Sequence, residues 1–151
     1  MKIESSAFAE GDFIPARYSA YGENMSPPLH FRDVPFGTRS LALVLDDPDT
    51  SHGLFTHWIV FNLDPMTEGL KQGCRVSASR EGNNDRKTIG YFGPRPPDGE
   101  HRYFFHLYAL NKSLDLPNGI SRARFDEAIR GYVIEEAKLM GRFATPAEVK
   151  A

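Results

Sequence analysis

The sequence predicts a mainly β fold with a helical segment near its C-terminus, and three observations carry this prediction. Eleven prolines and thirteen glycines divide most of the chain into short runs, which is typical of strands joined by structured loops. Three apolar runs have the length and composition of strands, whereas apolar residues near the C-terminus recur at helical spacing. Because the 151 residues contain no internal repeat, we expect a single domain over residues 1–151.

Three central strands are predicted in the middle of the chain. Residues 39–46 (RSLALVLD) and 55–63 (FTHWIVFNL) are apolar runs, the second rich in β-branched and aromatic side chains. Residues 101–110 (HRYFFHLYAL) are aromatic or aliphatic at both alternating sets of positions, as expected of a strand covered on both faces. Shorter strands are predicted near residues 2–5, 29–31 and 74–79.

A helix is predicted over residues 121–143, because apolar side chains recur there at nearly helical spacing. Ser121 is a suitable N-cap and Gly141 a suitable stop, with the residues after it forming a short tail. Gly131 could weaken this helix or divide it in two.

The composition excludes several classes of protein. Eighteen basic and twenty acidic residues give a formal charge of -2, so no attraction to nucleic acid or to an anionic membrane is expected. No apolar run approaches the roughly 18 residues that a membrane-spanning helix needs. The single cysteine, Cys74, cannot form an internal disulfide, and the first residues do not resemble a signal peptide. We therefore expect a soluble protein of the reducing cytoplasm.

The first group of residues that could carry chemistry follows a predicted strand. The carboxylates of Asp46-Asp47-Pro48-Asp49 are costly to desolvate, so they should face a pocket, a partner or water. One interpretation is that they line a binding pocket, and the alternative is a solvent-exposed turn at Pro48. His57 lies within an apolar strand. If alternation places Phe55, His57 and Ile59 on one face, the imidazole needs a hydrogen-bond partner there, and a satisfied core histidine is the alternative.

The second group lies between Gly90 and Tyr103. Three prolines stiffen this loop, which suits a pocket wall. His101 and Tyr103 share one face of the following strand and could both donate to one anion, whereas Arg102 points to the other face. The alternative is a rigid connection between strands with Tyr103 in the core.

Taken in order, these motifs resemble the phosphatidylethanolamine-binding proteins, a family that includes the Raf kinase inhibitor proteins and prokaryotic relatives. The matching motifs are Asp47-Pro48-Asp49, His57-Trp58, Gly93-Pro94-Arg95-Pro96-Pro97 and His101-Arg102-Tyr103. Phe13-Ile14-Pro15 and the segment from Asn24 to Leu29 are similar to the family's amino-terminal part, so the resemblance covers nearly the whole chain. It is strongest to the short prokaryotic branch, and it implies a β-sandwich in which a large central sheet packs on a smaller one.

The resemblance also implies an anion pocket for a phosphate-bearing small molecule or a phospholipid headgroup. The implied ligand-binding residues are Asp47, Asp49, His57, Gly93, Pro97, His101 and Tyr103. In this hypothesis the histidines and Tyr103 donate hydrogen bonds while Asp47 and Asp49 accept them, provided that a histidine or the phosphate carries a proton. The resemblance implies no cofactor and suggests a homodimer.

Four positions depart from the family's pattern: Tyr21, Phe36, His52 and Arg95. Arg95 could add a fixed positive charge beside the pocket, or it could face solvent on a rigid loop. His52 could lie on the rim of the pocket.

Two other functions compete with ligand binding. By analogy with relatives, a surface patch could inhibit a kinase or a serine protease. Alternatively, two aspartates and two histidines (Asp47, Asp49, His57, His101) could hold zinc or iron in a metal-dependent hydrolase, although no H-E-x-x-H motif is present. Because nothing positions a nucleophile and no G-x-S-x-G motif occurs, we expect a binding protein and not an enzyme.

Overall fold

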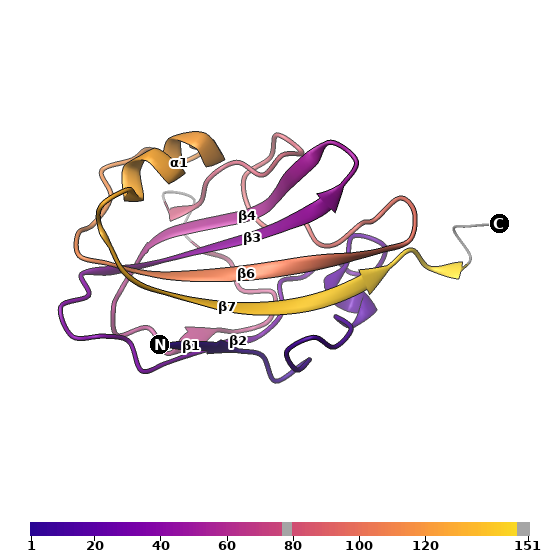
Figure 1. Cartoon of the computed structure of the whole chain (residues 1–151), viewed down its shortest axis with the longest axis horizontal. Helices are drawn as coiled ribbons and strands as arrows, with labels where there is room; N and C mark the ends of the chain where they lie inside the picture. Colours follow the sequence, from indigo (N-terminus) through magenta and orange to yellow (C-terminus); the bar gives the residue numbers. More distant parts are fainter. Residues whose placement is uncertain (77–79, 148–151) are drawn as a thin grey trace.

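The computed structural model describes residues 1–76 and 80–147, which form three layers (Figure 1). The central layer is an antiparallel sheet of order β4-β3-β6-β7, made of β3 (Ser40–Thr50), β4 (Gly53–Leu63), β6 (Glu100–Leu110) and β7 (Val133–Ala144). A smaller sheet of order β1-β2-β5 packs on one face, made of β1 (Lys2–Glu4), β2 (Leu29–Arg32) and β5 (Gly69–Leu70). The helix α1 (Arg122–Ile129) covers the other face, and a 3-10 turn, η1 (Ala16–Tyr18), lies in the first part of the chain. The predicted β-sandwich is confirmed.

Two apolar cores explain why the central strands are apolar at nearly every position. Alternate residues of β3, such as Leu41 and Leu43, pack between the two sheets, whereas Ala42 and Val44 pack against Phe125 on the helix side. All five side chains are fully buried. The sheet is therefore covered on both faces, which predicts long apolar runs in place of alternation.

The predicted helix over 121–143 is wrong in its second half. Ser121 does cap α1, its hydroxyl accepting from the Arg124 amide at 3.2 Å, but the helix ends at Ile129. Gly131 then adopts a φ of +86°, which suits glycine and reverses the chain into β7. Gly141 is no stop, because it lies within β7 opposite Tyr103.

One further sequence prediction needs correction, and one alternative is excluded. Cys74 to Val76 do not form a strand, and residues 77–79 of that predicted strand lie outside the described residues. The residues from Asp46 to Asp49 form no solvated turn, because β3 continues to Thr50 and both Asp46 and Asp47 are buried.

A β-bulge in β4 sets the direction of His57. Leu45 pairs with Trp58, but the next residue, Asp46, pairs with Thr56, so His57 is the extra residue of β4. The strict alternation considered for His57 and Ile59 is therefore wrong: Ile59 packs under α1, whereas His57 turns to the opposite face. The bulge places the imidazole at the end of the sandwich.

Among the described residues, no helix is long and apolar enough to cross a membrane.

Candidate functional site

One end of the sandwich holds a pocket of about 800 Å³, where the β3–β4 hairpin meets the loop that leads into β6. These segments lie together at the right of Figure 1. Six of the seven predicted site residues line this pocket: Asp47, Asp49, His57, Pro97, His101 and Tyr103. The two segments that carry the motifs thus meet in space, although they are more than thirty residues apart in sequence.

Gly93 is the predicted residue that does not line the pocket. Its amide donates to Asn24 Oδ1 at 2.7 Å, and a Cβ at this position would lie 2.3 Å from the Tyr18 carbonyl oxygen. A side chain cannot fit there, so Gly93 lets the pocket loop pack closely against η1.

Asp47 fixes the orientation of His101. The Nδ1 atom of His101 lies 2.6 Å from Asp47 Oδ2, and Asp47 Oδ1 accepts from the Asp49 amide at 2.7 Å. Since the carboxylate accepts, His101 Nδ1 carries the proton. Within the described part of the chain Nε2 of His101 makes no hydrogen bond, and this edge of the ring is left for the pocket.

His57 is held in the same way by a backbone carbonyl. Its Nδ1 donates to the Phe92 oxygen at 2.6 Å, and the two rings stack with centroids 5.4 Å apart and an interplanar angle of 3°. Burial lowers the pKa of His57 below its usual value, so the ring is neutral at pH 7. With Nδ1–H engaged, Nε2 of the neutral ring offers a lone pair to the pocket.

Tyr103 lies between the two histidines. Its ring meets that of His57 edge-on at 5.4 Å and stacks with that of His101 at 6.4 Å. The hydroxyl is the one buried side-chain polar atom in residues 1–76 and 80–147 without a hydrogen-bond partner of ordinary geometry. Burial and the nearby charge of Asp47 raise the pKa of Tyr103, so the hydroxyl keeps its proton and remains a donor.

Asp49 lines the pocket and is paired with an arginine of β6. Arg102 binds both of its oxygens, with Nη2 at 2.8 Å from Oδ1 and Nε at 2.9 Å from Oδ2. The hydrogen bonds from Arg102 lower the pKa of Asp49 to about 2. Its carboxylate is thus largely satisfied within the protein, and it joins the start of β6 to the end of β3.

Sequence reasoning missed several residues of the pocket. Phe55 and Phe92 form aromatic walls, and Arg86 reaches the pocket from the turn after residue 84. No local pattern marked Arg86, because its position depends on a contact with Phe92, 4.9 Å from guanidinium carbon to ring centroid. Arg95 and His52, left open by the sequence, both line the pocket as well.

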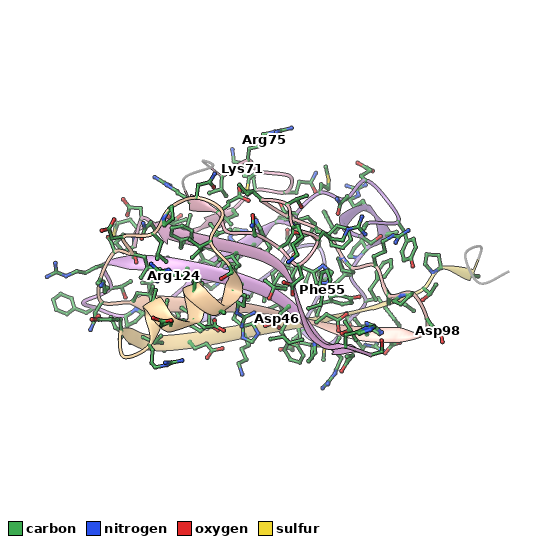
Figure 2. All side chains as sticks on the ribbon, turned by 90° about the horizontal axis from the view of Figure 1, so that it is seen from above. Asp46, Phe55, Lys71, Arg75, Asp98 and Arg124 are labelled. Carbon is green, nitrogen blue, oxygen red and sulfur yellow. The ribbon has the colours of Figure 1, made fainter. Side chains whose placement is uncertain are left out.

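A charged cluster lies on the opposite face of the sheet, beside α1, where Figure 2 shows Asp46. Asp46 accepts from His106 Nε2 and from Arg122 Nη1, both at 3.0 Å, and His106 Nδ1 lies 2.9 Å from Glu136. Burial opposes the charge of His106, but Asp46 and Glu136 outweigh it and raise the pKa of this histidine. Asp46 therefore supports the helix side while its neighbour, Asp47, faces the pocket.

A second cavity, of about 490 Å³, has Trp58, Tyr91 and Glu81 among its lining residues. Glu81 is buried and accepts from Trp58 Nε1 at 3.3 Å. Burial raises the pKa of this carboxyl group.

The side chains proposed as metal ligands do not converge. Asp47 pairs with His101 and Asp49 with Arg102. In the residues that the structure describes, no three His, Cys, Asp or Glu side chains are placed to share one metal ion.

The fold and the sequence both match known proteins. The family model for phosphatidylethanolamine-binding protein matches residues 4–144. A UPF0098 protein of Methanothermobacter thermautotrophicus is 46% identical over 148 residues, covering 95% of this chain and 98% of its own. The crystal structure of CT736 of Chlamydia trachomatis, a putative phosphatidylethanolamine-binding protein homologue, superposes with a TM-score of 0.91 at 41% identity, over 96% of this chain and 97% of its own. Escherichia coli YbcL shares the fold, with a TM-score of 0.88 at 24% identity over 96% and 98% of the two chains. The chain belongs to the phosphatidylethanolamine-binding protein family.

Proposed function

We propose that this protein binds a ligand with a phosphate group, either a phosphorylated small molecule or a phospholipid headgroup, in the pocket between the β3–β4 hairpin and the loop before β6. The proposal is one of binding and not of catalysis. The names of the family and of CT736 favour a ligand of this kind.

The observation that carries the proposal is the matched arrangement of two imidazoles. His57 and His101 each use Nδ1 within the protein and leave Nε2 to one pocket, and the Tyr103 ring packs against both of their rings. Three polar groups that converge in this way suit the tetrahedral oxygens of a phosphate better than a planar or apolar ligand. The aromatic walls exclude water and strengthen each hydrogen bond.

The protonation state of His57 sets a condition on the ligand. Neutral His57 offers a lone pair at Nε2, and so does His101 when its only ring proton is on Nδ1, so a fully deprotonated phosphate oxygen would meet each ring without a proton between them. Each of the two contacts therefore needs a proton, which either the histidine takes up or the phosphate carries. The complex then holds at least one more proton than the singly protonated rings and a phosphate dianion, so the affinity falls as the pH rises.

The experiment that tests the proposal is calorimetric titration with inorganic phosphate and with phosphoethanolamine at pH 6.5. We expect both to bind, and His57→Gln and His101→Gln each to weaken binding by about tenfold, the usual value of a charge-assisted hydrogen bond. His30→Gln is the matched control, since His30 is exposed on β2 of the other sheet. Unchanged affinity in both folded pocket variants would overturn the proposal.

The proposal extends to the setting of the protein. We infer a homodimer in a reducing compartment such as the cytoplasm, in keeping with Cys74, which is a free thiol. Light scattering coupled to gel filtration tests the dimer, and a monomer at micromolar concentration would contradict it.

A further inference from the structure

Two arginines, Arg86 and Arg95, stand at the exposed rim of the pocket. We propose that they form a second anion-binding position, so that the preferred ligand carries two negatively charged groups, as in a diphosphate or a phosphate joined to a carboxylate. This inference rests on the proposed function, because it takes the first group to be a phosphate at the two histidines. It concerns which phosphate-bearing ligands the pocket selects.

Arg86 is held in place by an aromatic ring of the pocket wall. Its guanidinium carbon lies 4.9 Å from the centroid of Phe92, and the Phe92 ring is stacked on that of His57. A guanidinium that lies over a ring keeps its N–H donors at the edge, where they can bind an oxyanion in a bidentate manner. Arg86 is thus one ring away from the imidazole proposed to contact the phosphate.

Arg95 is held by a second aromatic residue and comes from a different loop. Its guanidinium carbon lies 5.3 Å from the centroid of Tyr21, which itself stacks on Phe143 with ring centroids 6.4 Å apart. The Tyr21 hydroxyl donates to the Pro96 oxygen at 2.7 Å, so Tyr21 supports both Arg95 and the proline loop. Because both arginines are positioned beforehand, an anion that binds them loses less side-chain entropy.

The positive charge of the two arginines is not cancelled within the protein. Over residues 1–76 and 80–147, neither Arg86 nor Arg95 forms an ion pair, and the buried pocket carboxylate, Asp47, is engaged by His101. Asp49 is likewise engaged by Arg102. The remaining carboxylate of the pocket belongs to Asp98, an exposed residue that Figure 2 shows at the outer end of the molecule.

The experiment compares inorganic phosphate with pyrophosphate by calorimetry at pH 7 and a fixed ionic strength of about 0.1 M, since exposed charges are screened by salt. We expect the wild-type protein to bind pyrophosphate at least tenfold more tightly than phosphate. Arg86→Gln and Arg95→Gln should each reduce this preference severalfold, and the double variant should abolish it while phosphate affinity changes less than threefold.

Lys112→Gln is the matched control. Lys112 also lies over an aromatic ring, 4.4 Å from the centroid of Tyr132, but it follows the far end of β6 from His101. It changes the net charge by the same amount, so a preference due to overall charge would fall in this variant as well.

The outcomes separate this inference from the proposed function. If phosphate binds but pyrophosphate binds no more tightly, or if the preference survives in the double variant or falls equally in Lys112→Gln, the second position is refuted and the phosphate pocket stands. If neither anion binds the wild-type protein, both are refuted. A preference that disappears only with the two arginines supports the inference.

Discussion

Replacing Tyr103 by Phe should separate the stability of the fold from the function of the pocket. The change removes one buried oxygen that has no hydrogen-bond partner of ordinary geometry in the described structure. Such an unsatisfied group costs about 1–3 kcal/mol, so we expect the free energy of unfolding to rise by about 1 kcal/mol. If the hydroxyl donates to a bound phosphate, the same change should weaken phosphate binding by about tenfold.

Urea denaturation measures the first effect, followed by the fluorescence of Trp58, the only tryptophan, and by circular dichroism. With an m-value of about 2 kcal/mol per molar urea, the midpoint should rise by about 0.5 M. Tyr91→Phe is the matched control: the Tyr91 hydroxyl donates to the Tyr18 carbonyl at 2.6 Å, so its loss should lower the stability by about 1 kcal/mol. A Tyr103→Phe variant that loses as much stability as Tyr91→Phe would refute the reasoning, because the hydroxyl would then have a partner.

Four further predictions concern the charged cluster beside α1, the second cavity and the loop before β6. Asp46→Asn should lower the free energy of unfolding by about 3 kcal/mol at pH 6, because it removes the buried carboxylate that Arg122 and His106 share. Glu4→Gln is the control: it breaks an exposed ion pair with Arg32 and should lower the free energy of unfolding by about 1 kcal/mol at most. Because the pKa of His106 is raised in the folded protein, the stabilisation by protonated His106 is complete below the ordinary histidine pKa and is lost as the pH rises through the raised value. The urea midpoint of the wild type should therefore fall over that pH range, whereas the midpoint of His106→Gln should stay constant. Glu81→Gln should raise the free energy of unfolding more at pH 8 than at pH 5, because a buried carboxyl group with a raised pKa destabilises the fold once it ionises. The amide oxygen of the glutamine can still accept the hydrogen bond from Trp58. An equal effect of the substitution at both pH values would contradict this prediction. Gly93→Ala should lower the thermal midpoint by several degrees, because the new Cβ would collide with the Tyr18 carbonyl, and the displaced loop should bind phosphate more weakly. An unchanged midpoint would show that the loop does not pack closely against Tyr18.

The sequence predicted the central strands well because they are buried on both faces. Runs of apolar or aromatic residues occur in β3, β4 and β6, with β-branched side chains in β3 and β4, and this composition is typical of strands covered on both faces. β7 was missed because two signals overlap: Phe125 and Ile129 follow helical spacing, while Ala137, Leu139 and Phe143 follow strand spacing, each facing the core with an exposed or half-buried residue on either side. Only the reversal at Gly131 separates them, and a glycine alone does not show which element follows it.

The two segments that form the pocket could be predicted, but not the state of the groups within it. The lowered pKa of His57 comes from its burial, and the direction of its ring depends on the Phe92 carbonyl, 35 residues away, and on a β-bulge that no residue type indicates. Arg86 likewise reaches the rim through the stacking contact with Phe92 and not through any motif. Such features arise from tertiary contacts, which periodicity and spacing do not contain.

The central claim is that His57 and His101 bind a phosphate group with a shared proton, and the pH dependence of phosphate affinity tests it most directly. Calorimetry of the wild-type protein with inorganic phosphate from pH 6 to pH 9 should show the affinity falling by about tenfold per pH unit above pH 7.5, with one proton taken up on binding. The His57→Gln and His101→Gln variants should bind about tenfold more weakly at pH 6.5. Affinity that stays constant from pH 6 to pH 9, or that is unaffected by both substitutions, would contradict the account.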